Sequence, residues 1–356
     1  MESYHEYLKG RGAQINPPNR FLKQARDTSS SEGLDEPLDP DVRTQFFRDH
    51  PQKILNKVES PDIPLDYSMN PYQGCEHGCI YCYARNSHEY WGFSAGLDFE
   101  SKVVVKTEAA QLLEAELYHP AWRPTPIMFS GNTDCYQPAE RHFGITRQCL
   151  EVFRRFHHPV GLITKNSLIL RDLDILRDLA AERLVHVYIT ITTADEDLRR
   201  RMEPRTATAA RRFEVVRQLN EAGVPCGVML GPIIPGLNNH EFPALLERAA
   251  DAGAPAAHYT LVRLNGAIGP IFENWLHHNY PDRADKVLNQ IRGAHGGQLN
   301  DSQYGRRMRG EGAIAESIAG MFRIARQRHL AGRAMPAYNL EAFRRPPRGQ
   351  LSLFDQ

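Results

Sequence analysis

Short apolar segments alternate along the middle of the chain with longer segments in which apolar residues recur at every third or fourth position. Short runs of β-branched and apolar residues are typical of buried strands, whereas the three-to-four spacing is typical of helices that pack one face on a core. The predicted strands are Ile63–Met69, Pro126–Ser130, Val160–Thr164, Val185–Thr192, Pro225–Gly231 and Ala256–Val262. The predicted helices between them are Thr107–Tyr118, Thr146–Phe156, Leu170–Glu182, Ala207–Ala222 and His240–Ala252.

Strands that alternate with helices are typical of a parallel sheet, and this pattern predicts an α/β protein built as a partial (β/α)6 barrel similar to the TIM barrel. A short strand is added at Val103–Val105 and a late helix at Ala313–Arg328. The predicted organisation is a mostly irregular N-terminal arm (1–60), a core barrel (61–265), a C-terminal helical extension (266–334) and a flexible tail (335–356). Ligands of such folds bind at the carboxyl ends of the strands, where the candidate chemistry is expected.

The composition excludes some classes of protein. In 356 residues, 43 Lys and Arg balance 43 Asp and Glu, so any attraction to nucleic acid or an anionic membrane must be local. The longest apolar run, Cys226–Leu237, is interrupted by Pro232 and Pro235, which argues against a transmembrane helix. The N-terminus has no secretory pattern, so a cytoplasmic location with reduced cysteines is expected.

Three of the six cysteines lie close together. Cys75, Cys79 and Cys82 form a C-x3-C-x2-C motif directly after the first predicted strand. Three thiolates on one loop can bind zinc or an iron–sulfur cluster, and both usually take four ligands. A zinc site would have to recruit His77 or His88, whereas a 4Fe-4S cluster held by three cysteines keeps one iron open for a substrate or cofactor. Both alternatives fit the spacing.

With Tyr81 directly before its last cysteine, the motif resembles the signature loop of the radical S-adenosylmethionine (radical SAM) enzymes. The resemblance implies a 4Fe-4S cluster on the three cysteines, with S-adenosyl-L-methionine chelating the fourth iron through its amine and carboxylate. Reductive cleavage of that cofactor would give a 5′-deoxyadenosyl radical that abstracts hydrogen from a substrate. The resemblance also implies an electron donor such as flavodoxin or ferredoxin. A non-catalytic binding protein stabilised by zinc is the alternative from another class.

Over about residues 65–235 the chain resembles the spore photoproduct lyase and DNA-repair-photolyase-like branch of these enzymes. The cofactor-binding residues that this resemblance implies are Thr133, Lys165, Thr190, Thr192, Glu203, Arg205 and Gly231. Lys165 is expected on the carboxylate of S-adenosylmethionine, with Thr133, Thr190 and Gly231 around its amine and sugar. A zwitterion in a dry pocket needs such charged and hydroxyl partners. Glu203 and Arg205 could instead pair with each other on a solvated surface.

Candidate catalytic residues also come from the resemblance. Tyr81 and Tyr83 flank the last cysteine as two tyrosines do in spore photoproduct lyase, where they are thought to relay a radical; the alternative is that both only pack. Cys135 is the candidate hydrogen donor, although it follows Asp134, whereas the lyase's donor precedes its Ser-Asp pair. Repair of the spore lesion itself is therefore not expected, and a buried inert thiol is the alternative for Cys135.

The first enzyme hypothesis is a nucleic-acid substrate, in DNA repair or modification, and local clusters of arginine could contact its phosphates despite the neutral total charge. The clusters are Arg199, Arg200, Arg201, Arg205, Arg211 and Arg212; Arg306, Arg307 and Arg309; and Arg344, Arg345 and Arg348. Each cluster could also be an ordinary solvated face. The alternative enzyme function is radical modification of a protein or a small molecule.

The C-terminal tail carries a candidate partner motif, Q-L-S-L-F, beginning at Gln350. It resembles the motif by which bacterial polymerases and repair proteins bind the DNA sliding clamp. In that interpretation Gln350 hydrogen-bonds at the edge of the clamp pocket, Leu353 and Phe354 fill it, and Leu351 adds apolar contact. The alternative is a tail that folds back and buries its leucines on the barrel.

Overall fold

The computed structural model describes residues 7–21, 43–63 and 65–347. Its centre is a seven-stranded sheet with the order β10-β9-β8-β7-β6-β3-β2. All neighbours from β3 to β10 are parallel, and only β2 at the edge is antiparallel. The strands are β2 (Leu55–Lys57), β3 (Tyr67–Met69), β6 (Ile127–Phe129), β7 (Val160–Thr164), β8 (Val185–Thr190), β9 (Cys226–Ile233) and β10 (Ala257–Leu261).

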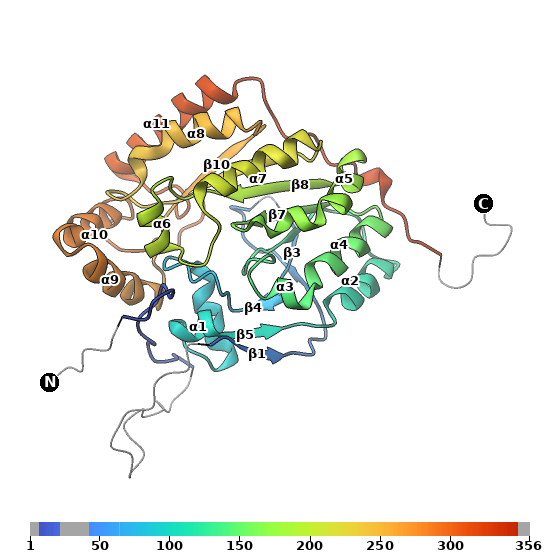
Figure 1. The fold of residues 1–356 in the computed structure, drawn as a ribbon, viewed down its shortest axis with the longest axis horizontal. Coiled ribbons are helices and arrows are strands. Elements are labelled where there is room, and N and C mark those ends of the chain that lie inside the picture. The colour runs from blue at the N-terminus through green and yellow to red at the C-terminus, as the bar shows by residue number, and fades with distance from the viewer. Residues whose placement is uncertain (1–6, 22–42, 64, 348–356) are drawn as a thin grey trace, which may run out of the picture.

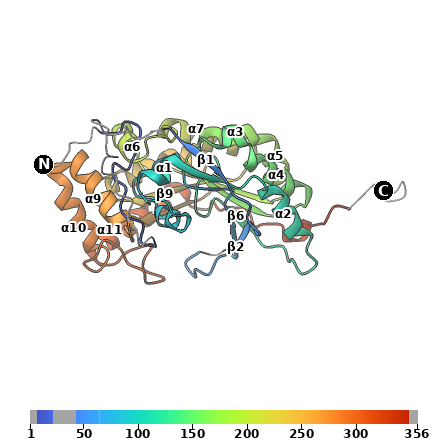
Figure 2. The ribbon, with the colours of Figure 1, turned by 90° about the horizontal axis from the view of Figure 1, so that it is seen from below.

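Helices cover one face of this sheet, as Figures 1 and 2 both show for α4, α5 and α7. The helices that follow successive strands are α2 (Ala109–Tyr118), α4 (Ile145–Arg155), α5 (Leu173–Ala181), α7 (Ala209–Glu221) and α8 (Phe242–Asp251). α11 (Gly312–Leu330) packs on α8. The parallel sheet and its helices confirm the α/β half-barrel predicted from the alternation of strands and helices.

Alternate residues of the strands explain why one face is covered and the other is not. In β8, Val185, Val187 and Ile189 belong to the main hydrophobic core, whereas His186 and Tyr188 between them are only half-buried. Successive side chains of a strand point to opposite faces, so the helices bury the first set. The second set faces the inside of the half-barrel.

The segment after α11 passes the amino ends of the strands. His186 stacks on Tyr338, with ring centroids 3.8 Å apart, and Asn339 donates its amide to the carbonyl of Arg183. Figure 1 shows this segment in red, running past α5 toward α4 and α2. The opposite edge, at the carboxyl ends, is left to the loops that carry the candidate chemistry.

A second, three-stranded sheet has the order β1-β5-β4, with β1 at Gln45–Arg48, β4 at Tyr72–Gln73 and β5 at Lys102–Val105. The predicted extra strand at Val103–Val105 is thus part of β5. The expectation of a mostly irregular arm is corrected in one respect, because β1 and β2 both lie within residues 1–60. The first predicted strand is shorter than expected, since β3 begins at Tyr67.

Several short elements were not predicted, because each is too short to show a clear helical period in its apolar residues. They are η1 (Tyr83–Trp91), α1 (Leu97–Ser101), α3 (Glu140–Phe143), η2 (Ser167–Asp172), α6 (Glu196–Met202), η3 (Asn239–Glu241), η4 (Pro281–Arg283) and η5 (Leu340–Ala342). α9 (Ile268–Asn279) and α10 (Ala284–Gly293) follow β10. Among the described residues, no helix is both long and apolar enough to cross a membrane.

Candidate active site

The three-cysteine loop follows β4 and makes tight turns. The amide of Cys75 donates to the carbonyl of Phe99 at 2.8 Å, and the amide of Cys82 donates to the carbonyl of Cys79 at 3.3 Å. Gly78 has a φ of +67°, and a Cβ there would lie 2.8 Å from a carboxylate oxygen of Glu100. The loop therefore needs glycine at this position, both for its backbone conformation and for space.

Glu100 ties this loop to the N-terminal arm. Its buried carboxylate accepts from the amides of Gly12 and Ala13 and from the guanidinium of Arg85, the last at 2.6 Å. Arg85 in turn donates to the carbonyl of Cys79 at 3.0 Å. Because a buried pair of charges is stable only when its other hydrogen bonds are made, the arm and the cysteine loop support each other's conformation.

A second buried ion pair joins the ends of β8 and β9 to the loop. Arg212 of α7 donates to one carboxylate oxygen of Glu203 at 2.5 Å and to the carbonyl of Thr190 at 3.0 Å. The other oxygen of Glu203 accepts from Thr192 at 2.6 Å and from the hydroxyl of Tyr81. Burial by itself would raise the pKa of Glu203, but Arg212 and then Lys165 outweigh it and lower that pKa to about 2. The carboxylate is therefore charged at neutral pH.

Asp134 organises the ends of β6 and β7. Its carboxylate accepts from the hydroxyl of Thr164 at 2.7 Å and from the amide of Lys165 at 2.9 Å, and it pairs with His77 at 3.3 Å. His77 lies between Cys75 and Cys79 in the sequence, so this contact joins the loop to β7. Burial opposes the charge of Asp134, yet its pairing with His77 lowers its pKa to about 2.

The ammonium group of Lys165 is held among opposite charges. Burial alone would lower its pKa, but Cys79, Glu203 and Asp134 together raise it. Within the described parts of the chain, this ammonium forms no hydrogen bond and no ion pair. A cation at the strand ends without a direct partner is suited to bind the carboxylate of a ligand.

The three cysteines fit an iron–sulfur cluster. Burial, Asp134 and the other two loop cysteines all raise the pKa of Cys75, and burial raises that of Cys79 to about 12, so these thiols need a metal to become thiolates at neutral pH. In residues 7–21, 43–63 and 65–347 no three His, Cys, Asp or Glu side chains are placed around a single metal ion. A 4Fe-4S cluster takes each cysteine at a different iron, so its ligands need not surround a single ion.

The structure brings together five of the residues predicted from the sequence. Tyr81, Thr190, Thr192, Glu203 and Gly231 are joined in one polar network, in which the hydroxyl oxygen of Thr192 also lies 3.1 Å from the carbonyl oxygen of Gly231. A Cβ on Gly231 would lie 2.8 Å from the hydroxyl of Thr260. This glycine therefore keeps the end of β9 close to β10.

Other predicted site residues lie elsewhere or make other contacts. Thr133 is buried and donates to the carbonyl of Tyr72 at 2.6 Å. The alternative of a pair between Glu203 and Arg205 is not observed: Arg205 lies 3.7 Å from Glu76, and Arg212 occupies the carboxylate of Glu203.

Tyr83 and Cys135 differ in their access to solvent. Tyr83 is 52% exposed, and its hydroxyl donates to the carbonyl of Gly131. Cys135 is fully buried in the main core cluster, whereas Cys79 and Cys75 belong to two other clusters. A role for Cys135 as hydrogen donor stays a prediction, and its packing is that of a core thiol.

Four residues that build the site are absent from the predicted catalytic and cofactor-binding residues: Asp134, His77, Glu100 and Arg212. Of these, His77 was considered only as a ligand in the zinc alternative. Arg212 was placed in a surface cluster, but it is only 1% exposed and Arg199 only 6%, so this cluster does not present all its charges to solvent. Arg263, in the loop after β10, is also absent from the predicted set. A carboxylate in the loop that follows a predicted strand, as in Thr133-Asp134, was the available signal.

The fold and the site together define an α/β half-barrel with a three-cysteine loop at the carboxyl ends of its strands. Residues 69–249 match the sequence model of the radical SAM superfamily. The chain therefore belongs to this superfamily, whose members are enzymes that use a 4Fe-4S cluster and S-adenosylmethionine. This membership decides against the non-catalytic zinc protein.

The similar proteins include several of known sequence but without an assigned activity. The chain is 34% identical to the uncharacterized protein Rv2578c of Mycobacterium tuberculosis, over 65% of this chain and 69% of that protein. It is 27% identical to the uncharacterized protein MJ0683 of Methanocaldococcus jannaschii, over 67% of this chain and 85% of that protein.

Solved structures of spore photoproduct lyase have the same fold. Its complex with dinucleoside spore photoproduct gives a TM-score of 0.59 at 14% identity, covering 81% of this chain and 80% of the lyase. A mutant of the lyase with bound AdoMet and the same dinucleoside gives 0.61 at 14% identity, covering 87% and 86%. At this identity the likeness establishes the fold.

Proposed function

We propose that this radical SAM enzyme acts on a nucleic-acid substrate, in the repair or modification of DNA. When bound, the cluster and S-adenosylmethionine supply a 5′-deoxyadenosyl radical for hydrogen abstraction. The protein holds the cluster through Cys75, Cys79 and Cys82. Lys165 binds the methionyl carboxylate, because its ammonium is charged and has no ion-pair partner in the described part of the chain.

The remaining predicted residues shape the cofactor pocket. Thr133, Thr190 and Gly231 would surround the amine and sugar of the bound cofactor. The paired carboxylate of Glu203 fixes Thr192 and Tyr81. These contacts favour positioning roles for Thr192 and Glu203. Arg205, held near Glu76 rather than Glu203, is the weakest member of the predicted set.

Arg263 carries the proposal of a nucleic-acid substrate. It lies half-buried after β10, close to Tyr83 and to Arg307, which pairs with Asp62; burial and then Arg307 lower its pKa. No ion pair or hydrogen bond of its guanidinium is formed within the described residues. An unpaired cation beside an exposed tyrosine suits a polyanion whose bases can stack on the ring. The lyase bound to dinucleoside spore photoproduct supports the same class of substrate.

The test offers ultraviolet-irradiated and undamaged oligonucleotides, deuterated in their sugars and bases, to the reduced holoenzyme with S-adenosylmethionine. Transfer of deuterium into 5′-deoxyadenosine is expected with at least one of them. Formation of 5′-deoxyadenosine without label from any nucleic acid would favour the second candidate, a protein or small-molecule substrate. Omission of the reductant is the matched control.

Tyr83 is the stronger of the two candidates for radical relay, because its ring is exposed whereas Tyr81 is committed to Glu203 and Thr192. Tyr83→Phe removes the phenolic O–H but keeps the ring. Loss of turnover with unchanged S-adenosylmethionine binding would support a relay. Unchanged turnover would assign Tyr83 to packing or stacking.

Two partners and a location complete the proposal. An electron donor such as flavodoxin or ferredoxin reduces the cluster, and the enzyme works in the cytoplasm. The clamp motif, with Gln350, Leu351, Leu353 and Phe354, lies outside the described residues. A labelled peptide of residues 345–356 is expected to bind a bacterial sliding clamp with micromolar affinity, and Leu353→Ala or Phe354→Ala should abolish that binding. Equal, negligible binding by all three peptides would contradict the clamp proposal.

A further inference from the structure

A pocket of about 630 Å³ lies between α11 and the edge strand β10, outside the cysteine site. Its floor consists of the rings of Tyr259 and Phe322, whose centroids are 4.7 Å apart. Four arginines line it, and no acidic residue does so among the described residues. They are Arg309, Arg323, Arg326 and Arg333. We call this site the α11 pocket.

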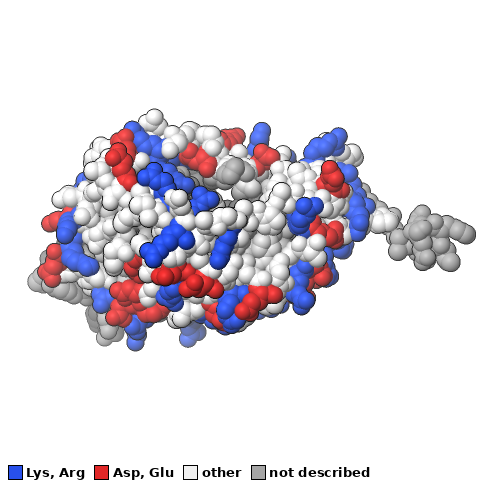
Figure 3. All heavy atoms as spheres, turned by 90° about the horizontal axis from the view of Figure 1, so that it is seen from above, with Lys and Arg blue, Asp and Glu red and all other residues white. Residues whose placement is uncertain are grey.

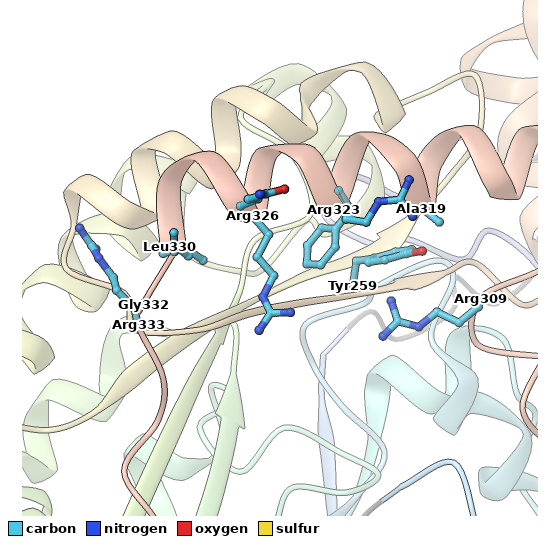
Figure 4. Close-up of a pocket in the computed structure, with 11 residues that line it drawn as sticks. Tyr259, Arg309, Ala319, Arg323, Arg326, Leu330, Gly332 and Arg333 are labelled. Carbon is cyan, nitrogen blue, oxygen red and sulfur yellow. The ribbon is translucent and has the colours of Figure 1, made fainter.

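The charges of the α11 pocket are not neutralised by the protein. Arg309, Arg323 and Arg326 are exposed and have no ion-pair partner in the described part of the chain. The guanidinium of Arg309 lies 4.4 Å from the centroid of the Tyr259 ring, and Arg333 donates to the carbonyl of Ala250 at 2.8 Å. Figure 4 shows Arg309 and Arg326 extending toward the same space below α11. Two of the four cations are thus positioned by the protein itself.

The segment that precedes α11 leads from the pocket, through Arg309, to the carboxyl end of β10. His258 lies on the inner side of β10 and contacts Tyr188. Its pKa is lowered mainly by burial and further by the charges of Arg309 and Arg326. The carbonyl of Met308 accepts from the amide of Leu261 at 3.0 Å, so the segment before α11 follows the edge strand. That segment also contains Arg307, the neighbour of Arg263 at the end of β10.

Basic side chains therefore run from the end of β10 to α11. Viewed from the side of α8 and α11, Lys and Arg side chains gather beside a hollow in the surface (Figure 3). This local concentration exists in a chain whose formal net charge is zero. Within this row Arg307 is paired with Asp62, whereas Arg263, Arg309, Arg323 and Arg326 have no ion-pair partner among the described residues. Because bulk attraction is absent, these four spaced guanidinium groups point to a ligand with spaced negative charges, such as successive phosphates.

We propose that the α11 pocket binds backbone phosphates of a nucleic acid whose target nucleotide lies at the cysteine site. This inference rests on the proposed nucleic-acid substrate and adds the path of its strand, from Arg263 across β10 to Arg323 and Arg326. Guanidinium groups bind phosphate oxygens in pairs of hydrogen bonds and read no base, so the pocket contributes affinity and position rather than sequence preference.

The test measures binding of a fluorescent duplex to the full-length holoenzyme by anisotropy, between 50 and 200 mM KCl (about the range over which phosphate contacts are screened). The variants are Arg323→Glu, Arg326→Glu and the double variant. The matched control is Arg328→Glu, an exposed arginine of the same helix that does not line the pocket. Uncoupled cleavage of S-adenosylmethionine reports whether each variant keeps an intact catalytic centre.

The double variant is expected to weaken binding about tenfold or more at low salt, and to reduce the slope of log K against log salt by about 0.9 for each lost phosphate contact. Arg328→Glu should change neither value. Inorganic pyrophosphate, added at constant ionic strength, should compete no better than chloride. Strong competition by pyrophosphate would overturn the proposal in favour of a small phosphorylated ligand.

Two kinds of failure are distinguishable. One outcome is that the wild-type enzyme binds the duplex and that the pocket variants have the same affinity for it as Arg328→Glu. In that case the pocket assignment fails but the proposed substrate class stands. If the wild-type enzyme binds no nucleic acid and transfers no label from it, the proposed substrate class fails, and the pocket assignment with it.

Discussion

Two arginine-rich regions of the molecule differ in how their charges are balanced. At the ends of β8 and β9, Arg212 is buried against Glu203 and closes a hydrogen-bond network. In the α11 pocket, Arg323 and Arg326 are exposed and lack such partners within the described residues. The first region uses its arginine to hold the site together, and the second has cations available for a ligand. Pairing, rather than the number of arginines in a sequence window, separates the two roles.

The largest effect is expected from Arg212→Ala. Removal of this guanidinium leaves the carboxylate of Glu203 buried without its counter-charge, which costs about 3–5 kcal/mol in comparable buried pairs. Anaerobic urea unfolding would measure the loss. Arg211→Ala, which removes the exposed neighbouring arginine, is the control and should leave the midpoint unchanged. Equal midpoints for the two variants would show that the ion pair does not stabilise the fold.

Burial also makes the stability of the fold depend on pH through a neutral histidine, His158. His158 accepts from the indole N–H of Trp122 at 3.1 Å and contacts the carbonyl of Pro159 at 2.9 Å, and burial lowers its pKa to about 4. The unfolded chain binds a proton below about pH 6.5, whereas the folded chain does so only near pH 4. Its contribution to stability is therefore complete above pH 6.5 and is lost as the pH falls toward 4.

We expect the wild-type protein to lose up to about 3 kcal/mol through His158 over that range, since one pKa unit corresponds to about 1.4 kcal/mol. The measurement is the difference in unfolding free energy between wild type and His158→Gln at pH 7.5 and at pH 4.5. A difference that does not change with pH would contradict the assignment.

Lys165→Met should weaken binding of S-adenosylmethionine by roughly 2 kcal/mol, or about thirtyfold, because a charge-assisted hydrogen bond to the carboxylate is lost. Calorimetric titration of the reconstituted enzyme measures this change. Lys106→Met is a control at a largely buried lysine of a different loop. If both variants bind S-adenosylmethionine like the wild type, Lys165 does not touch the cofactor.

Much of the fold could be predicted from the sequence because it depends on local periodicity. β7 matches its predicted bounds, and α4 is displaced from its prediction by one residue at each end. Of the small sheet only β5 was predicted, and its pairing could not be, because β1 lies far from β5 along the chain and neither strand alternates clearly. Such pairing is decided by tertiary contacts rather than by local preference.

The candidate site likewise has features that local sequence predicts and features that only tertiary contacts decide. The cysteine motif is local and could be recognised, as could the strand ends that carry Lys165 and Thr190. The partner of Glu203 could not, because Arg205 is nearer to it in the sequence than Arg212 and only the path of α7 brings Arg212 to its carboxylate. The same limit applies to Glu100, whose partners come from the N-terminal arm and η1.

The smallest effect on stability is expected from Arg217→Ala, at a position of α7 about one and a half turns after Arg212. Arg217 pairs with Glu214 and Glu221, each at 2.6 Å, so its geometry is as close as that of the buried pair. All three side chains are substantially exposed, and water and salt screen such pairs. Arg217→Ala should therefore leave the urea midpoint within error of the wild type, with or without 1 M NaCl (about a 3 Å screening length). Because the helix, the residue type and the distances are shared, a loss as large as that of Arg212→Ala would show that geometry rather than burial sets the strength of these pairs.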